Sequence, residues 1–78
     1  MEKPRIISNP QIMVGKPVIE GTRLTVELIV QELSEGHSIE EMLYAYPRLT
    51  RAGILAALEY AAAVVRHDEI FPVFEHAA

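Results

Sequence analysis

Apolar residues recur at spacings of three and four in three stretches of the chain. This spacing places them on one face of an α-helix, which turns once in about 3.6 residues. The three stripes are Val26-Ile29-Val30-Leu33, Ile39-Met42-Leu43-Tyr46 and Ile54-Leu58-Ala61-Ala62-Val65. The pattern predicts three amphipathic helices, each with one face turned to a core.

Capping residues define where the first two helices begin and end. Thr25 suits the N-cap of the first helix, and Gly36 suits the left-handed position just after its end. Ser38 and Glu41 have the spacing of a capping box, in which each side chain accepts a hydrogen bond from the other residue's backbone N–H. Pro47 ends the second helix, because proline lacks the N–H that a helix interior needs.

The third helix is predicted from Arg51 to about His67, with Thr50 as its N-cap. Gly53 in its first turn costs up to about 1 kcal/mol relative to alanine. A second apolar stripe lies on another face of this helix: Ala52, Ala56, Tyr60 and Ala63. A helix with two apolar faces is buried on two sides, so either the N-terminal arm or a second copy of the chain covers this stripe. We expect a homodimer through these four residues, because the arm is short and small side chains permit close helix packing.

The segment before the helices consists of extended pieces broken by turns. Residues 5–7 are β-prone, and proline and glycine interrupt the chain at 8–10 and 15–17. Residues 17–19 and 22–24 flank Glu20-Gly21, a tight-turn pair, which predicts a short β-hairpin. Because an isolated two-stranded ribbon is barely stable, this arm must lie on the helices or on a second subunit.

The chain of 78 residues is expected to form one domain. Residues 1–25 are the β-type arm, 26–67 the three-helix bundle and 68–78 a C-terminal tail. The sequence contains no cysteine, which is typical of reducing compartments, and no run of the about 20 apolar residues that span a bilayer. We therefore expect a cytoplasmic protein with no membrane partner.

The net charge of −4 disfavours nucleic acid as a partner, but the charges alternate in blocks. Residues 1–25 and 48–66 are net positive, whereas 26–47 contain five glutamates and no basic residue. Two basic segments that converge in the fold would make one positive patch. The alternative is ordinary solvated charge.

Four residues, 47–50, separate the second and third predicted helices, which is the spacing of a helix-turn-helix. In that motif the first turn of the last helix enters the DNA major groove, where arginine suits guanine edges and phosphates. The basic arm can reach phosphates or a neighbouring minor groove. The candidate DNA-contacting residues are Arg48, Thr50, Arg51, Lys16, Arg23 and Arg5.

Two features oppose this interpretation. Glu40 and Glu41 begin the second helix, which in this motif lies near the DNA backbone, and phosphates repel carboxylates. Ala52 and Gly53 also leave the first turn of the third helix poor in side chains that read bases. The alternative is a three-helix bundle that makes no DNA contact and acts as a protein-interaction module or dimeric scaffold.

The tail contains both phenylalanines of the chain. Its apolar residues are Ile70, Phe71, Val73 and Phe74. They either pack back on the bundle or anchor the tail in a partner protein, with nearby carboxylates steering it toward a basic surface. Deletion of residues 68–78 separates the two possibilities, since loss of core residues unfolds the chain.

Catalysis finds little support in the sequence. None of the histidines, at 37, 67 and 76, has the spacing of a metal pair, and no serine lies in a nucleophile motif. No glycine-rich phosphate loop is present. We expect no enzyme activity, no metal, no cofactor and no small-molecule substrate.

Three segments resemble the bacterial and archaeal domain of unknown function 433 family. They are residues 15–26 (GKPVIEGTRLTV), 36–43 (GHSIEEML) and 46–50 (YPRLT), and the resemblance extends over residues 5 to about 66. It implies a homeodomain-like three-helix fold. It also implies a VapB-type antitoxin that represses its own operon by binding promoter DNA and blocks a PIN-like ribonuclease toxin with its C-terminal segment. The family favours an acidic residue near position 53, where this chain has glycine.

Overall fold

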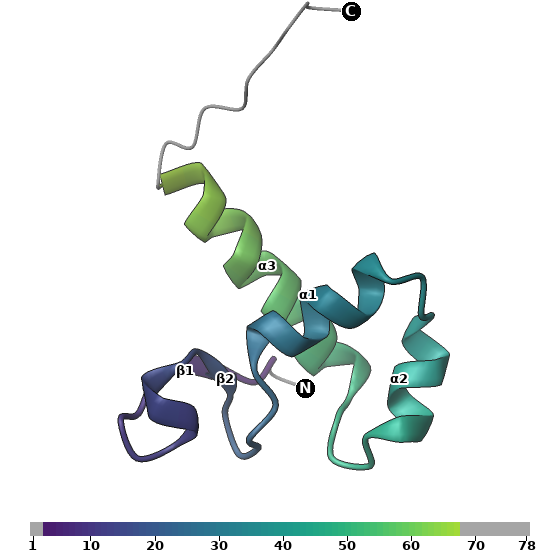
Figure 1. Ribbon diagram of the computed structural model, residues 1–78, viewed down its shortest axis with the longest axis horizontal. Helices are drawn as coiled ribbons and strands as arrows, with labels where there is room; N and C mark the ends of the chain where they lie inside the picture. The colour runs from purple at the N-terminus through teal and green to yellow at the C-terminus, as the bar shows by residue number, and fades with distance from the viewer. Residues whose placement is uncertain (1–2, 68–78) are drawn as a thin grey trace, which may run out of the picture.

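The computed structural model describes residues 3–67, which form three helices and a small two-stranded antiparallel sheet near the N-terminus (Figure 1). The strands are β1 (Ile6–Ile7) and β2 (Val18–Ile19), with a 3₁₀ turn, η1 (Met13–Gly15), between them. The helices are α1 (Val26–Ser34), α2 (Ile39–Ala45) and α3 (Arg51–His67). The three predicted helices are confirmed. No helix in this part of the chain is long and apolar enough to cross a membrane.

The predicted signals at both ends of α1 are confirmed. Thr25 Oγ1 accepts a hydrogen bond from the Leu28 N–H at 2.9 Å. At the other end Gly36 has a φ of +95°, a left-handed conformation that glycine adopts without steric cost. The Gly36 and His37 N–H groups donate back to the Leu33 and Glu32 carbonyls, a Schellman motif that satisfies two carbonyls at the helix end.

Side-chain caps also start α2 and α3 where the sequence predicts. Ser38 and Glu41 form the complete capping box, with N···O distances of 3.0 and 2.7 Å. Thr50 Oγ1 accepts from the Gly53 N–H at 3.0 Å. Each of these bonds satisfies a backbone N–H that has no partner within the helix.

The arm is a sheet rather than the simple hairpin that the turn residues predict. Ile6 pairs with Ile19 and Ile7 with Val18, so the regular partner of β2 is the strand that precedes it in sequence. The predicted pairing across Glu20-Gly21 exists only as a single bridge between Val18 and Thr25. The hairpin cannot extend further because residue 26 begins α1.

The core lies where the arm and all three helices meet. The largest fully buried side chains are Val18, Ile29, Met42 and Ile54. Val18 and Ile19 of β2 are both buried, although successive strand residues point to opposite faces of a sheet. One face of β2 therefore packs on the helices, and the rest of the arm covers the other.

The apolar stripes of α1 and α3 are buried less completely than their spacing predicts. Val30 is 37% exposed and Val65 is 55% exposed, and Ala62 is also exposed. In Figure 1 the second half of α3 projects beyond the other elements, so the stripe continues past the last element that could cover it. Ala57, which is absent from the predicted stripe, is fully buried beneath α1 and β2.

The arm covers part of the second apolar stripe of α3. Both strands contact this helix, and Ala56 is only 6% exposed within the single chain. A Cβ built on Gly53 would lie 3.5 Å from Ile19 Cδ1, so β2 lies within van der Waals reach of this side of the helix. The stripe was expected to be covered either by the arm or by a second copy of the chain. At Ala56 the arm covers it, and this residue has little exposed surface left for a second copy.

Candidate nucleic-acid interface

The turn between α2 and α3 is anchored on its apolar side and exposed on its basic side. Leu49 is 5% exposed and its N–H donates to the Tyr46 carbonyl at 2.9 Å. Arg48, its neighbour, points away from the core and donates from Nη1 to the Gly21 carbonyl at 3.3 Å. The helix turn and the loop between β2 and α1 thus lie side by side, although 27 residues separate these two positions in the sequence.

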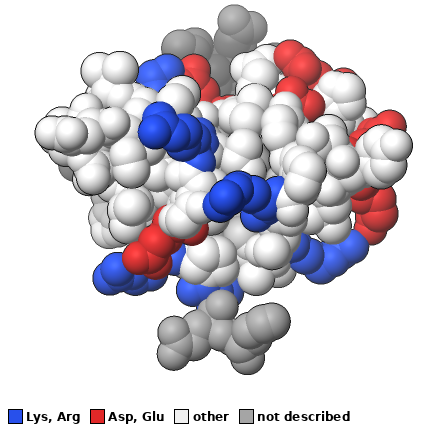
Figure 2. All heavy atoms as spheres, turned by 90° about the horizontal axis from the view of Figure 1, so that it is seen from below, with Lys and Arg blue, Asp and Glu red and all other residues white. Residues whose placement is uncertain are grey.

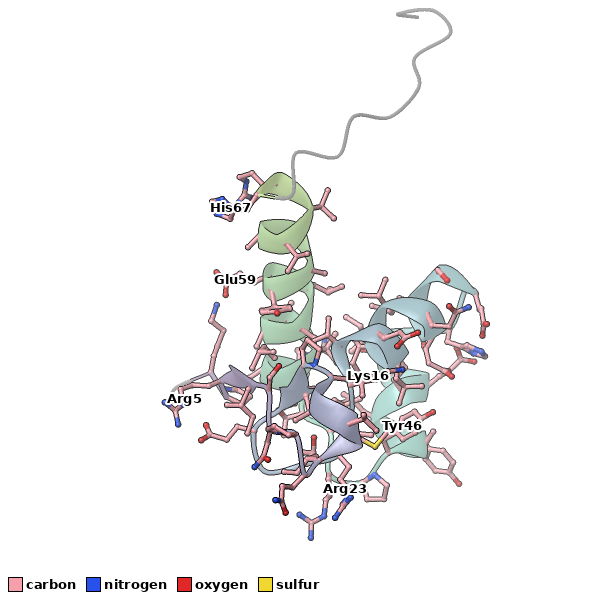
Figure 3. The ribbon with its side chains drawn as sticks, turned by 60° about the vertical axis from the view of Figure 1, so that its left-hand side comes forward. Arg5, Lys16, Arg23, Tyr46, Glu59 and His67 are labelled. Carbon is pink, nitrogen blue, oxygen red and sulfur yellow. The ribbon has the colours of Figure 1, made fainter. Side chains whose placement is uncertain are left out.

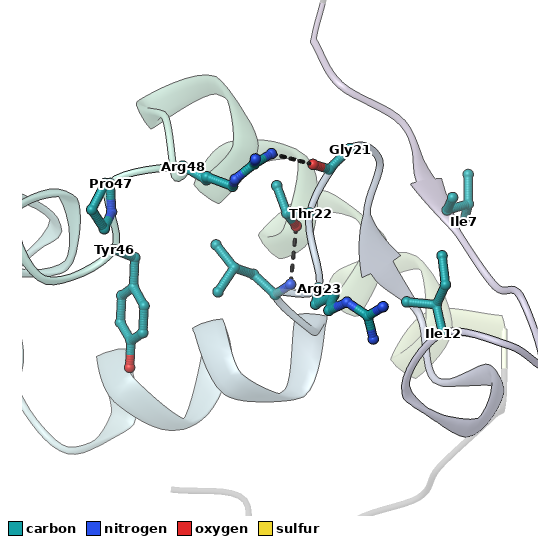
Figure 4. A pocket seen from close by; sticks show the side chains of 9 residues that line it. Ile7, Ile12, Gly21, Thr22, Arg23, Tyr46, Pro47 and Arg48 are labelled. Atoms are coloured by element: carbon teal, nitrogen blue, oxygen red, sulfur yellow. Dashed lines mark hydrogen bonds between the residues drawn. The ribbon is translucent and has the colours of Figure 1, made fainter.

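A groove of about 590 Å³ lies between the arm and the helix turn. In Figure 4 Tyr46 and Pro47 stand on one side of the β2–α1 loop, and Ile7 and Ile12 stand on the other. The lining is predominantly apolar, with two arginines as its only charged groups. Its residues are Ile7, Ile12, Gly21, Thr22, Arg23, Leu24, Tyr46, Pro47 and Arg48.

Local hydrogen bonds fix the loop that carries Arg23. Thr22 Oγ1 donates to the Ile19 carbonyl at 2.8 Å and accepts from the Leu24 N–H at 3.0 Å. Gly21 takes a φ of +85°, which closes the turn. Arg23 itself is exposed, and its guanidinium makes no hydrogen bond or ion pair to residues 3–67.

The two groove arginines differ from the other basic candidates, because neither of them is paired with a carboxylate in the described part of the chain. Arg5 forms two hydrogen bonds with Glu20, at 3.1 and 2.8 Å, Lys16 lies 2.9 Å from Glu27, and Arg51 lies 2.7 Å from Glu40. Figure 2 shows this face, with Lys and Arg side chains across its middle and most of the carboxylates in view toward its margins. A positive charge that no local carboxylate neutralises is available to an anionic partner.

Two of these ion pairs lower the pKa of the carboxylate that takes part in them. The hydrogen bond from Arg5 lowers the pKa of Glu20, and the same contact raises the pKa of Arg5. Arg51 lowers the pKa of Glu40 in the same way. Glu40 is therefore ionised and held by Arg51, which reduces its repulsion of an approaching phosphate and also occupies Arg51.

The structure brings together only part of the predicted DNA-contacting set. Arg48 and Arg23 lie at the groove, while Arg5 and Lys16 lie elsewhere on the arm (Figure 3). Thr50 is exposed, but its hydroxyl is used by the helix cap. Of the predicted dimer interface, Ala52, Tyr60 and Ala63 are half-buried in the single chain. The predicted toxin-binding residues, Ile70, Phe71, Val73 and Phe74, lie outside the described residues.

The apolar walls of the groove are functional candidates that sequence reasoning missed. Ile7 and Ile12 come from the arm, and Tyr46 was assigned to the core stripe of the second helix. A stripe position at the last turn of a short helix can face either the core or the following turn. The sequence feature that could have indicated this wall is Tyr46-Pro47, an aromatic ring and a rigid residue directly before an arginine.

The fold and the groove define a small three-helix domain with a β-type arm. Residues 6–61 match the family described as "Protein of unknown function (DUF433)", and the chain belongs to this family, as its three segments indicate. It is 41% identical over 58 residues to "Uncharacterized protein y4eO" of Sinorhizobium fredii (strain NBRC 101917 / NGR234), a match that covers 74% of this chain and 26% of the relative. The chain thus spans about a quarter of the length of that curated relative.

A solved structure shares the fold. The crystal structure of a DUF433 member protein from Anabaena variabilis ATCC 29413 superposes with a TM-score of 0.75 at 29% sequence identity. The match covers 85% of this chain and 64% of that one. Over the matched part, this chain therefore shares its fold with that member of the family.

Proposed function

We propose that this chain is a DNA-binding antitoxin of a toxin–antitoxin pair. It represses its own operon, and its C-terminal segment neutralises a PIN-like ribonuclease toxin. Helices α2 and α3 with the turn between them then act as a homeodomain-like helix-turn-helix. The observation that carries the DNA half of the proposal is that Arg23 and Arg48 lie on one exposed surface beside the first turn of α3, with no carboxylate partner among residues 3–67.

The position of these arginines suits contacts to the DNA backbone. Arginine's planar guanidinium makes two parallel hydrogen bonds to a phosphate. Arg48 lies on the turn that leads into α3, and Arg23 on the adjoining loop, so one strand of a duplex can touch both when α3 enters the major groove. Phosphate contacts of this kind set the register of a protein on DNA without reading its sequence.

Base reading falls to the exposed side of α3. Arg51 is exposed there, and Leu55 is 49% exposed one turn later. An exposed leucine on a recognition helix suits the methyl group of thymine. Arg51 reaches DNA only by leaving Glu40, and exposed ion pairs of this type contribute no more than about 1 kcal/mol, so the exchange is feasible.

Binding of the chain to a fluorescent duplex from its own promoter tests the DNA half. We expect Arg23→Ala/Arg48→Ala to lose at least about tenfold in affinity, equal to 1.4 kcal/mol. The matched control is Arg5→Ala/Lys16→Ala, which removes the same charge from residues that are already paired and is expected to lose less than about threefold. Equal losses in the two variants would show that net charge, not this site, governs binding.

A second candidate function is a protein-interaction module that makes no DNA contact. It is favoured by a second groove of about 310 Å³, where α3 leaves the body of the domain. Its apolar lining includes Tyr60, Val64 and Val65, and Val65 is 55% exposed. If the promoter duplex fails to bind while Val64→Ser/Val65→Ser abolishes capture of the protein encoded by the neighbouring gene, this second function holds instead.

A further inference from the structure

The groove between the arm and the helix turn has more apolar surface than contact with DNA phosphates requires. Ile7, Ile12 and Leu24 line it together with the ring of Tyr46. Phosphates gain nothing from aliphatic walls, whereas apolar side chains of a peptide do. Two guanidinium groups at the same groove, neither held by a carboxylate of residues 3–67, add a preference for carboxylates.

The chain itself contains a segment of this complementary chemistry. Residues 70–74 are Ile-Phe-Pro-Val-Phe, and carboxylates flank them at Asp68, Glu69 and Glu75. Pro72 restricts its own backbone and that of the residue before it toward extended conformations, which lowers the entropy cost of binding. Apolar anchors between acidic flanks match an apolar groove with two arginines in both hydrophobicity and charge.

We propose that the groove of one chain binds residues 68–75 of a second copy, and that this contact competes with DNA for Arg23 and Arg48. The proposal deepens the proposed function, on which its DNA competition rests, because it assigns a regulatory partner to the same arginines. A toxin that captures the tail then frees the groove and promotes DNA binding.

The chain that follows α3 is too short for residues 70–74 to lie along the groove of the same chain. Arg51, beside the groove, and His67 are separated by 16 helical residues, or about 24 Å at the helical rise. Ile70 is three residues beyond His67 and reaches at most about 11 Å back from it. Figure 3 places Arg23 and His67 at opposite ends of the molecule, so the tail of one chain cannot lay residues 70–74 along its own groove.

Sedimentation of the full-length chain with complementary variants tests the contact. We expect the parent chain to dimerise with increasing concentration, while Arg23→Ala/Arg48→Ala and Phe71→Ser/Phe74→Ser each remain monomeric. The two variants mixed should form a dimer again, because one supplies an intact tail and the other an intact groove. Circular dichroism of each variant confirms that it is folded, and rescue in the mixture does so independently.

Two results would overturn the proposal. One is a parent chain that stays monomeric at every concentration, and the other is a dimer that persists unchanged in both variants, which would place the interface elsewhere, for example on α3. DNA affinity is measured separately with Phe71→Ser/Phe74→Ser, which we expect to bind the promoter duplex more tightly than the parent. If no chain binds DNA while the mixture still dimerises, the proposed function fails and the groove–tail contact stands.

Discussion

Five basic side chains were predicted to contact DNA, and they differ in what already holds them. Three are neutralised by a glutamate between 2.7 and 2.9 Å away, as Lys16 is by Glu27. Arg23 and Arg48 are not paired in this way to any of residues 3–67. The sequence shows which residues are charged but not which of them form ion pairs. It therefore could not predict which basic side chains are neutralised by a glutamate and which are not.

Gly53 shows how one residue sets the distance between two elements. A Cβ at this position would lie 3.3 Å from Thr50 Oγ1 and 3.5 Å from Ile19 Cδ1, which is tight but not prohibitive. We expect Gly53→Ala to change the free energy of unfolding by less than about 1 kcal/mol, because the gain in helix propensity offsets the close approach. Gly53→Leu should cost about 1–3 kcal/mol, since a larger side chain pushes β2 away from α3.

Urea unfolding of the two variants measures these differences directly. A leucine variant as stable as the alanine variant would mean that β2 does not pack closely against α3.

At the scale of elements, four exposed ion pairs connect parts of the fold, one of which is Lys16–Glu27, between the arm and α1. Lys3 joins the arm to α3 through Glu59, at 2.7 Å, and Arg51 joins α3 to α2 through Glu40. Arg5 and Glu20 join β1 to the turn after β2. The pairs of Lys3 and Lys16 hold the arm on α3 and α1, in addition to the burial of Val18 and Ile19.

Three of these pairs make the stability of the fold sensitive to acid. Lys3, Arg5 and Arg51 lower the pKa of Glu59, Glu20 and Glu40, so each of these carboxylates binds its proton less readily in the folded chain than in the unfolded one. Their contribution to stability is complete above pH 4.5, the ordinary pKa of glutamate, and is lost as the pH falls below it.

We expect the urea midpoint of the parent chain to fall more steeply between pH 5 and about pH 3 than that of Glu20→Gln/Glu40→Gln/Glu59→Gln. The difference between the two should shrink in high salt, because all three carboxylates are exposed. Parallel midpoints across this pH range would mean that the ion pairs do not stabilise the fold.

The helices could be predicted from the sequence, and the arm could be predicted only in part. Local signals such as Thr25, the Ser38–Glu41 box and Thr50 act within a few residues, and the structure has all of them in place. The pairing of β1 with β2 joins residues that are about 12 positions apart in the sequence. It depends on contacts with α3, which the periodicity of apolar residues does not reveal. For the same reason Val65 fits the core stripe by spacing but is exposed, since nothing among residues 3–67 extends far enough to cover it.

On the scale of the whole molecule, the two grooves lie on different parts of the fold. One holds Arg23 and Arg48 beside the helix turn, and the other follows the projecting half of α3. Under the proposed function, this separation would let the domain contact DNA with one surface while the other end of α3 remains open to a protein partner. The proposed contact between the groove of one chain and residues 68–75 of a second copy would link DNA binding to the binding of a protein partner.

The central claim is that Arg23 and Arg48 contact DNA phosphates, and the salt dependence of promoter binding tests it most directly. Each phosphate contact contributes about 0.9 to the slope of log affinity against log salt concentration. We predict that Arg23→Ala/Arg48→Ala lowers this slope by about 2 relative to the parent. Arg5→Ala/Lys16→Ala should leave it within about 0.5 of the parent value, because those side chains are already paired. A double variant with the same slope as the parent would contradict the claim, whatever its affinity.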